Sequence, residues 1–170
     1  MTGPLHGVKV FDLTVAGVGP YATMLLANMG ANVVKVEQGP AWPPLHQGLP
    51  PNYNGLSVVY MTCHNGKRGI YLNLKSPEGK EAALRLLKEA DVFAENMSYG
   101  TVQRLGLGYE DISRINSGII YGNFPGWGDS GPYASRGSAD PTAQVFGGAV
   151  SVTGQKGGDP ELIRWPGLYD

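Results

Sequence analysis

The hydrophobic and polar positions of this chain alternate between two periods. Short apolar runs rich in β-branched and aromatic residues predict strands over residues 8–13, 31–37, 70–74, 91–95 and 118–124. Amphipathic or small-residue segments predict helices over residues 21–29, 100–105, 109–115 and 141–152, and a further helix that starts at residues 76–78. Strands that alternate with helices predict an α/β fold with a mainly parallel sheet.

The ends of two of these helices can be predicted from single residues. Pro20 is expected at the first position of the helix over 21–29, and Gly30 is expected to end it. Ser76 supplies an N-cap hydroxyl for the next helix, directly before Pro77. The apolar face of that helix is expected to contain Ala83, Leu84, Leu86 and Leu87, with Glu81 and Arg85 paired on its surface.

A long segment between the second and third predicted strands lacks a regular pattern. Residues 38–56 are rich in proline and glycine, and they predict an irregular loop of the length that often serves as a lid or binding segment. Residues 57–62 fit a short helix and an extended piece equally well.

Composition narrows the classes of partner. The 170 residues include 13 basic and 14 acidic side chains, so no positive excess favours nucleic acid or a membrane surface. No apolar run approaches the ~20 residues that span a bilayer, and residues 1–7 lack the pattern of a signal peptide. Cys63, the single cysteine, predicts a buried or half-buried thiol, no internal disulfide, and a cytoplasmic compartment or an equivalent reducing lumen. The three histidines are scattered, and we expect no metal site.

One glycine-rich turn follows the first predicted strand. Residues 17–22 match G-x-G-x-x-A, and Glu37 lies 20 residues beyond Gly17, which is the spacing of a dinucleotide-binding fingerprint. The backbone N–H groups at the start of a helix attract phosphate, but Pro20 removes one of them. The motif alone fits an NAD-binding protein and a tight turn that binds nothing.

Four cations lie near the predicted ends of strands or helices. Lys67 and Arg68 are adjacent on a turn, and we expect them, like Lys75 and Arg104, at the solvated surface. If several of them converged at the carboxyl edge of the sheet, they would suit a ligand that carries several phosphates.

Ordered motifs along the chain resemble those of the family III CoA-transferases, which include formyl-CoA transferases, carnitine CoA-transferases and α-methylacyl-CoA racemases. The matching segments are residues 4–14, 19–20, 24–37, 65–70, 74–79, 91–96, 104–109 and 126–133. The resemblance covers Pro4 to Asp170, and we favour it over the NAD-binding alternative because the glycine fingerprint is a single short motif.

The resemblance implies a Rossmann-like large domain that binds coenzyme A (CoA) as part of an acyl-CoA substrate. The positions that contact CoA in the family correspond here to Val15, Ala16, Gly17, Val18, Leu72, Lys75, Asn96, Met97 and Arg104. Many members carry an arginine directly after the acid that ends the second strand, and this chain has Gln38 there.

The resemblance also implies a catalytic aspartate at Asp170. Its carboxylate would attack an acyl-CoA thioester and then carry CoA as an aspartyl-CoA thioester to an acceptor carboxylic acid. The racemase branch needs a histidine before Asp140, and this chain has Ala139, which cannot move a proton. We therefore expect CoA transfer rather than racemisation, with Asp140 and Pro141 starting a helix.

Family members are about twice as long as this chain. We expect residues 1–170 to be the N-terminal part of the large domain, without the small domain and the C-terminal return of the chain. The isolated chain would then be inactive, whereas the full-length protein would be a homodimer, or this chain would associate with a missing C-terminal chain. The alternative is a non-catalytic module that binds CoA or a nucleotide.

Overall fold

The computed structural model describes residues 3–37 and 50–163. The chain divides into two compact units, Met1–Phe124 and Pro125–Asp170. Gln38 and Asp170 lie outside the described residues.

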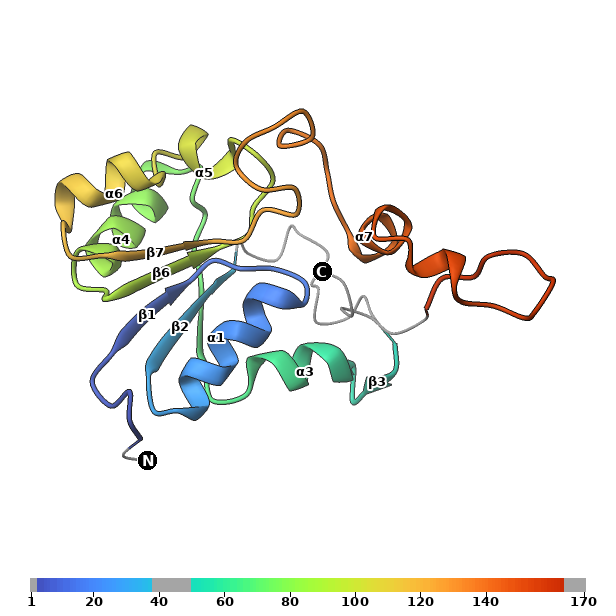
Figure 1. Cartoon of the computed structure of the whole chain (residues 1–170). Helices are drawn as coiled ribbons and strands as arrows, with labels where there is room; N and C mark the ends of the chain where they lie inside the picture. The colour runs from blue at the N-terminus through green and yellow to red at the C-terminus, as the bar shows by residue number, and fades with distance from the viewer. Residues whose placement is uncertain (1–2, 38–49, 164–170) are drawn as a thin grey trace. The chain divides into compact units, whose positions relative to one another are not determined.

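The first unit is built on a five-stranded sheet whose order is β5-β2-β1-β6-β7 (Figure 1). Every neighbouring pair of strands in this sheet is parallel. The strands are β1 (Lys9–Asp12), β2 (Asn32–Glu37), β5 (Arg68–Tyr71), β6 (Val92–Glu95) and β7 (Ile120–Asn123). In chain order the arrangement is 3-2-1-4-5, which is the order of a Rossmann-type half. The α/β prediction is therefore confirmed.

Helices cover both faces of this sheet. On one face, α1 (Val18–Asn28) packs beside α3 (Val58–His64), and on the other α4 (Pro77–Lys88) packs beside α6 (Tyr109–Ile115) (Figure 1). A shorter helix, α5 (Thr101–Arg104), follows β6.

Two apolar clusters show how the strands divide their side chains between these faces. Val10 packs in the cluster that includes Leu26 of α1. Phe11, the next residue, packs in the cluster that includes Leu87 of α4 and meets Phe93 edge-on, with ring centroids 5.4 Å apart. Successive residues of a strand point to opposite faces, so β1 supplies both cores.

Several helix and strand boundaries differ from those predicted. α1 begins at Val18 rather than Tyr21, because the Tyr21 N–H already donates to the Gly17 carbonyl at 2.9 Å. Pro20 is therefore the third residue of the helix and not the first, a position that still lies within the first turn, where a missing N–H breaks no helical bond.

Two predicted strands also differ from the observed ones. β5 covers Arg68–Tyr71 instead of 70–74, and all four of its residues are exposed because it lies at one edge of the sheet. The apolar run over residues 118–124 is typical of a buried strand, but that expectation is wrong: β7 lies at the other edge of the sheet, and Ile120 is 66% exposed.

The helix predicted from Ser76 is confirmed as α4. The Ser76 hydroxyl accepts from the Gly79 N–H at 3.1 Å, as its N-cap role requires. Ala83 and Leu87 are buried, but Leu86 is exposed, and the ion pairs among the described residues do not include the one expected between Glu81 and Arg85.

Residues 52–57, at the end of the proline-rich segment, form a small hairpin. β3 (Asn52–Tyr53) pairs antiparallel with β4 (Leu56–Ser57), and α3 follows directly. Of the stretch 57–62, residues 58–62 are therefore helical, with Ser57 as the N-cap.

The second unit has little regular structure over residues 125–163. The predicted helix over 141–152 is divided into α7 (Asp140–Phe146) and a 3₁₀ turn, η1 (Ala149–Ser151), because Gly148 between them has a φ of 75°. Three aromatic rings pack together on this unit, those of Trp127, Tyr133 and Phe146.

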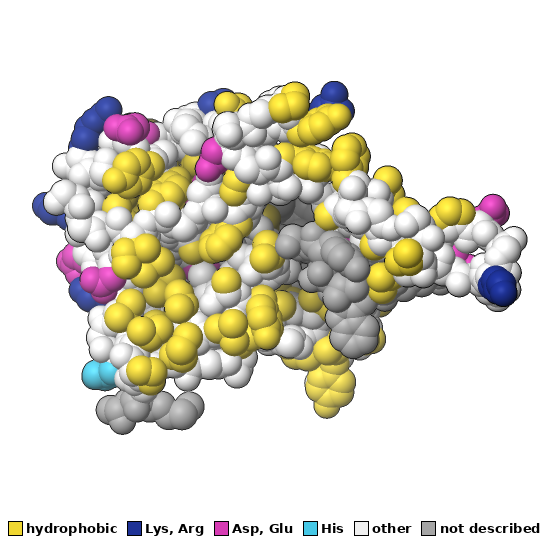
Figure 2. All heavy atoms as spheres, viewed as in Figure 1, with side chains coloured by type: hydrophobic (Ala, Val, Ile, Leu, Met, Phe, Trp, Pro, Cys, Tyr) yellow, Lys and Arg dark blue, Asp and Glu magenta, His cyan; other side chains and the backbone are white. Residues whose placement is uncertain are grey.

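The exposed surface of α1 is apolar. Tyr21, Leu25 and Met29 lie four residues apart and are 40% to 50% exposed, and Figure 2 shows hydrophobic side chains gathered over this helix. α1 contains no charged residue. No helix within residues 3–37 and 50–163 is long and apolar enough to cross a membrane.

Candidate functional site

The carboxyl ends of β1 and β6 form the topological switch point of the sheet. β1 lies between β2 and β6. After β1 the chain continues to α1 on one face of the sheet, whereas after β6 it continues to α5 and then to α6 on the other face. Connections that diverge in this way leave a crevice outside the strand ends, where open α/β sheets bind their ligands.

Two of the predicted CoA-contacting segments meet at this point. The Asn96 side chain accepts from the Val15 N–H at 2.7 Å through Oδ1 and donates to the Val15 carbonyl at 2.8 Å through Nδ2. Asn96 directly follows β6, and Val15 lies in the loop between β1 and α1, 81 residues away in sequence. This pair of bonds fixes the loop against the neighbouring strand.

The same loop has an unusual backbone. Ala16 has a φ of 63°, a left-handed conformation that costs a residue with a side chain about 1 kcal/mol or more. Gly19 packs against Thr14 so closely that an added Cβ would lie 2.5 Å from the Thr14 Cβ. A glycine is therefore required at position 19 for the helix to approach the strand end.

The first turn of α1 leaves backbone donors free. Among the described residues, no acceptor pairs with the N–H groups of residues 16–19. Free N–H groups at the start of a helix attract anions, and phosphate is the commonest of these.

A buried charged network lies behind this loop. Asp12, the last residue of β1, is fully buried, and its Oδ2 accepts from Lys67 Nζ at 2.8 Å. Its Oδ1 accepts from the N–H of Thr14 at 2.9 Å and from the Thr14 hydroxyl, and its Oδ2 also accepts from the Thr23 hydroxyl at 2.7 Å. Lys35, opposite Asp12 on β2, donates to the Thr14 carbonyl.

The pKa values of these groups follow from burial and from each other's charge. Burial alone raises the pKa of Asp12, but the charges of Lys35 and Lys67 and the hydrogen bonds to the carboxyl outweigh it, so this pKa lies below its ordinary value. Burial lowers the pKa of both lysines, and the negative charge of Asp12 opposes that effect. Removing the Asp12 carboxylate, or one of the two lysines, would therefore leave a buried charge that water solvates poorly.

The expectation that Lys67 lies at the surface is wrong. Its side chain is 2% exposed because Asp12 draws it under the first turn of α1, whereas the adjacent Arg68 is exposed as predicted. Sequence reasoning missed the network. The available signal was a charged residue, Asp12 or Lys35, inside an otherwise apolar strand run.

The remaining predicted contacts lie at the same edge of the sheet or beyond it. Leu72 directly follows β5, and its N–H donates to the Glu37 carbonyl at 2.9 Å, while Lys75 is exposed in the turn before α4. Met97 follows Asn96, and its N–H donates to the Glu95 carboxylate at 2.9 Å. The Arg104 guanidinium is exposed and donates to the Thr101 hydroxyl at 2.9 Å within its own turn.

α3 carries a cysteine and a histidine, Cys63 and His64. Cys63 is a buried free thiol, as predicted, and burial raises its pKa, so it stays protonated at neutral pH. His64 stacks on Tyr60 with ring centroids 4.0 Å apart, and burial lowers the pKa of His64 to about 4. The described residues contain no group of three or more His, Cys, Asp or Glu side chains that would hold a metal ion.

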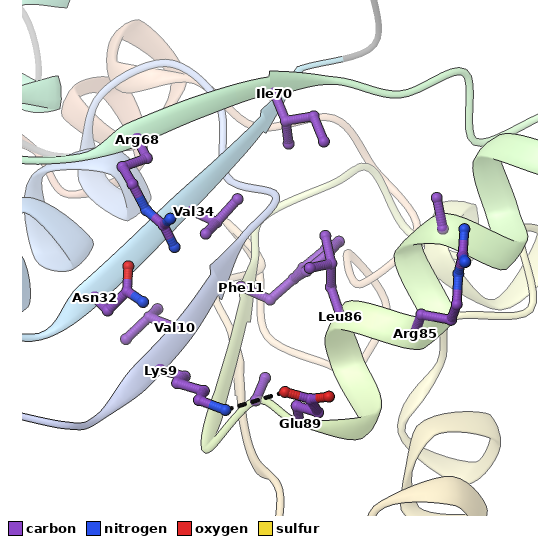
Figure 3. A pocket seen from close by; sticks show the side chains of 12 residues that line it. Lys9, Val10, Phe11, Asn32, Val34, Arg68, Ile70, Arg85, Leu86 and Glu89 are labelled. Carbon is purple, nitrogen blue, oxygen red and sulfur yellow. Dashed lines mark hydrogen bonds and ion pairs between the residues drawn. The ribbon is translucent and has the colours of Figure 1, made fainter.

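A cavity of about 490 Å³ lies away from this crevice. Its wall includes the first residues of three strands, Lys9, Asn32 and Arg68, together with Leu86 and Glu89 of the α4 region (Figure 3). It therefore opens on the α4 face toward the amino ends of the strands, whereas the predicted contacts lie at the carboxyl ends.

Comparison with known proteins identifies the family. The family model described as "CoA-transferase family III" matches residues 5–169. The chain belongs to this family. It is 40% identical over 157 residues to the succinyl-CoA:glutarate CoA-transferase of Homo sapiens, covering 92% of this chain and 36% of that protein.

Other family III relatives give the same result. The formyl-CoA:oxalate CoA-transferase of Escherichia coli O81 (strain ED1a) is 37% identical over 171 residues, covering 100% of this chain and 41% of that protein. The crystal structure of a CaiB/BaiF family protein from Brucella suis superposes with a TM-score of 0.88 at 34% identity, covering 97% of this chain and 44% of that one. The chain thus spans less than half the length of these relatives and corresponds to their N-terminal part.

Proposed function

We propose that this chain forms the CoA-binding, N-terminal part of the large domain of an acyl-CoA:carboxylate CoA-transferase. One observation carries the proposal: the Asn96 amide holds the Val15 peptide group with two hydrogen bonds at the switch point of the sheet. Family III membership supports CoA rather than a dinucleotide as the ligand of this loop.

The residues at this edge suit the parts of CoA. The N–H groups of residues 16–19, which have no acceptor among the described residues, and the exposed cations Lys75 and Arg104 would bind its phosphate groups. Val15, Val18, Leu72 and Met97 offer apolar surface to the adenine and pantetheine parts.

Asp170 is the proposed nucleophile. Its carboxylate oxygen attacks the carbonyl carbon of the donor thioester, and the C–S bond breaks to give a mixed anhydride and CoA thiolate. The thiolate then attacks the aspartyl carbonyl, which releases the donor as a carboxylate and leaves an aspartyl-CoA thioester. An acceptor carboxylate reverses these two steps, takes the CoA and restores Asp170.

The proposed substrates are an acyl-CoA and a carboxylic acid. The relatives named above act on small mono- and dicarboxylic acids, which is the substrate class we propose here. Racemisation is not part of the proposal because Ala139, the N-cap residue of α7, lacks an acid or base function.

Full activity is proposed to need chain beyond residue 170. The relatives are more than twice as long, and we propose that a homodimer of the longer protein, or association with a separate C-terminal chain, completes the site. A reducing, cytoplasmic setting is part of the proposal, since Cys63 is a free thiol.

Calorimetric titration of the 170-residue chain with CoA tests the binding half. We expect saturable binding that Asn96→Ala weakens by about tenfold, because the Val15 loop loses its two bonds. Asn116→Ala is the matched control: the Asn116 side chain also makes two hydrogen bonds to the backbone, donating to the carbonyls of Leu87 at 3.0 Å and Ala90 at 2.7 Å, but at the other end of the sheet. Equal loss in both variants, or no binding by the unmodified chain, would contradict the proposal.

Exchange of labelled CoA between an acyl-CoA and a free acid tests the chemical half. We expect no turnover by the 170-residue chain, and turnover by a version that continues beyond residue 170 in the manner of its relatives. Asp170→Ala in that longer version should abolish turnover and leave CoA affinity intact. Retained turnover would show that Asp170 is not the nucleophile, and a non-catalytic module would show no turnover in either version.

A further inference from the structure

The ammonium group of Lys67 connects the end of β1 to the first turns of α1. Lys67 lies in the turn between α3 and β5, and its Nζ donates to Asp12 Oδ2 at 2.8 Å, to the Pro20 carbonyl at 2.7 Å and to the Thr23 hydroxyl at 2.7 Å. These three acceptors use all three N–H groups of an ammonium. The side chain is 2% exposed, so Lys67 has no donor left for a ligand.

A second cation holds the other flank of the same loop. Lys35 donates to the carbonyl of Thr14, the residue before Val15, and to the carbonyl of Val36 at 3.3 Å. Asp12 is next to both lysines. It lies opposite Lys35 in the register of β1 and β2, and its carboxylate forms an ion pair with Lys67. The loop over residues 15–19 is thus bound at both ends to one buried cluster.

In this arrangement the backbone carbonyls of the loop and the backbone N–H groups of residues 16–19 differ in whether they are hydrogen-bonded. The carbonyls of Thr14, Val15 and Pro20 are bound by Lys35, Asn96 and Lys67. The N–H groups of residues 16–19 have no acceptor in the described part of the chain. A set of backbone donors held ready in this way binds an anion without a further loss of conformational entropy.

We propose that Lys67 is a positioning residue for CoA binding: its ammonium, held against Asp12, fixes the loop over residues 15–19 in the shape in which its free N–H groups receive a phosphate group. The inference rests on the proposed function and adds to it a residue that touches no ligand. Lys67 therefore differs from Lys75 and Arg104, whose exposed charges would meet the phosphates directly.

Lys67→Met is the main variant, and Lys9→Met is its matched control. Both changes remove one lysine charge, but Lys9 is 51% exposed and lies at the other end of β1. The first readout is amide hydrogen exchange without ligand at Thr14, Val15 and Tyr21, whose N–H groups are bonded within or beside the loop. The second readout is CoA affinity by calorimetry.

The inference predicts a local effect of Lys67→Met. Exchange at these three amides should quicken by about tenfold or more relative to the amides of α4, and CoA should bind about tenfold more weakly. Lys9→Met should change neither. A general loss of stability would instead speed exchange in α4 and in the loop alike, and that result, or an unchanged CoA affinity, would overturn the inference.

Thr23→Val keeps the test available if Lys67→Met does not fold. This change retains every charge and removes only the hydroxyl that bridges Lys67 and Asp12. It should give the same local signature at about threefold, and unchanged exchange at the three amides would overturn the inference. If the unmodified chain binds no CoA, the proposed function fails, whereas loss of loop protection in Lys67→Met would still support the role of Lys67 in fixing the loop over residues 15–19.

Discussion

The two ends of β1 each carry a lysine–carboxylate ion pair of nearly equal length. At the carboxyl end, Lys67 lies 2.8 Å from Asp12, and the two side chains are 2% and 0% exposed. At the amino end, Lys9 lies 3.1 Å from Glu89, and the side chains are 51% and 73% exposed (Figure 3).

The difference between these pairs lies in their surroundings and not in their geometry. Water screens the outer pair, so it contributes little to stability and leaves both side chains free to move. The inner pair has lost its water, and each charge depends on the other and on Thr14, Thr23 and the Pro20 carbonyl. The rigid end of the strand is therefore the one beside the proposed binding loop.

Removing the carboxylate of each pair should give the largest difference in stability between the two ends of β1. Asp12→Ala leaves two buried ammonium groups without their counter-charge and should lower the free energy of unfolding by about 3–5 kcal/mol. Glu89→Ala should change it by less than about 1 kcal/mol. Urea-induced unfolding followed by circular dichroism measures both, and equal losses would mean that the inner pair is screened as well as the outer one.

A pH series extends the comparison to His64 of α3, whose pKa also responds to the charges of Lys67, Lys35 and Asp12. Burial lowers the pKa of His64 from 6.5 to about 4, so between these values the unfolded chain binds a proton that the folded chain does not. The contribution of His64 to stability is therefore complete above about pH 6.5 and is lost as the pH falls toward 4, by at most about 3 kcal/mol.

The matched pair for this series is His64→Gln and His6→Gln, since His6 is exposed. The free energy of unfolding of His64→Gln should depend less on pH between 6.5 and 4 than that of the unmodified chain. An unchanged slope in His64→Gln would contradict the assigned pKa shift.

Gly19 and Gly69 differ in how closely neighbouring atoms pack around them. Gly19→Ala would place a Cβ 2.5 Å from the Thr14 side chain beside the inner pair, and we expect a loss of about 1–3 kcal/mol. Gly69→Ala places its Cβ in open space on the exposed edge strand and should be neutral or slightly stabilising. Thermal unfolding compares the two, and an equal shift of the melting temperature would show that Gly19 is not closely packed.

The smallest expected effect concerns Ala16. Its left-handed backbone, with a φ of 63°, favours glycine, so Ala16→Gly should change the free energy of unfolding by no more than about 1 kcal/mol, in the stabilising direction. A clear destabilisation in urea would show that the Ala16 side chain makes contacts that outweigh the strain.

The sequence predicted the parts of this fold that depend on local patterns. The Ser76–Pro77 start of α4 and the Tyr109–Ile115 helix follow from capping residues and period, and both are confirmed. The edge positions of β5 and β7 depend instead on the order of strands in the sheet, which no local pattern encodes. Ile120 therefore appears in an apolar run and yet is exposed.

The candidate site, like the fold, could be predicted from the sequence only in part. Motif resemblance pointed to Val15 and Asn96 separately, and the structure joins them by two hydrogen bonds. Lys67 was expected in solvent because adjacent cations on a turn usually lie there. Its burial depends on Asp12, 55 residues earlier, and only the three-dimensional arrangement brings the two together.

Backbone amide shifts during a titration with CoA test the central claim most directly, because one experiment observes both ends of β1. We expect saturable changes at Ala16, Gly17, Val18 and Gly19 and at the Asn96 side-chain amide, with Lys9, Asn32 and Glu89 unaffected. Saturable changes confined to the amino-end cavity, or no changes at residues 16–19, would contradict it.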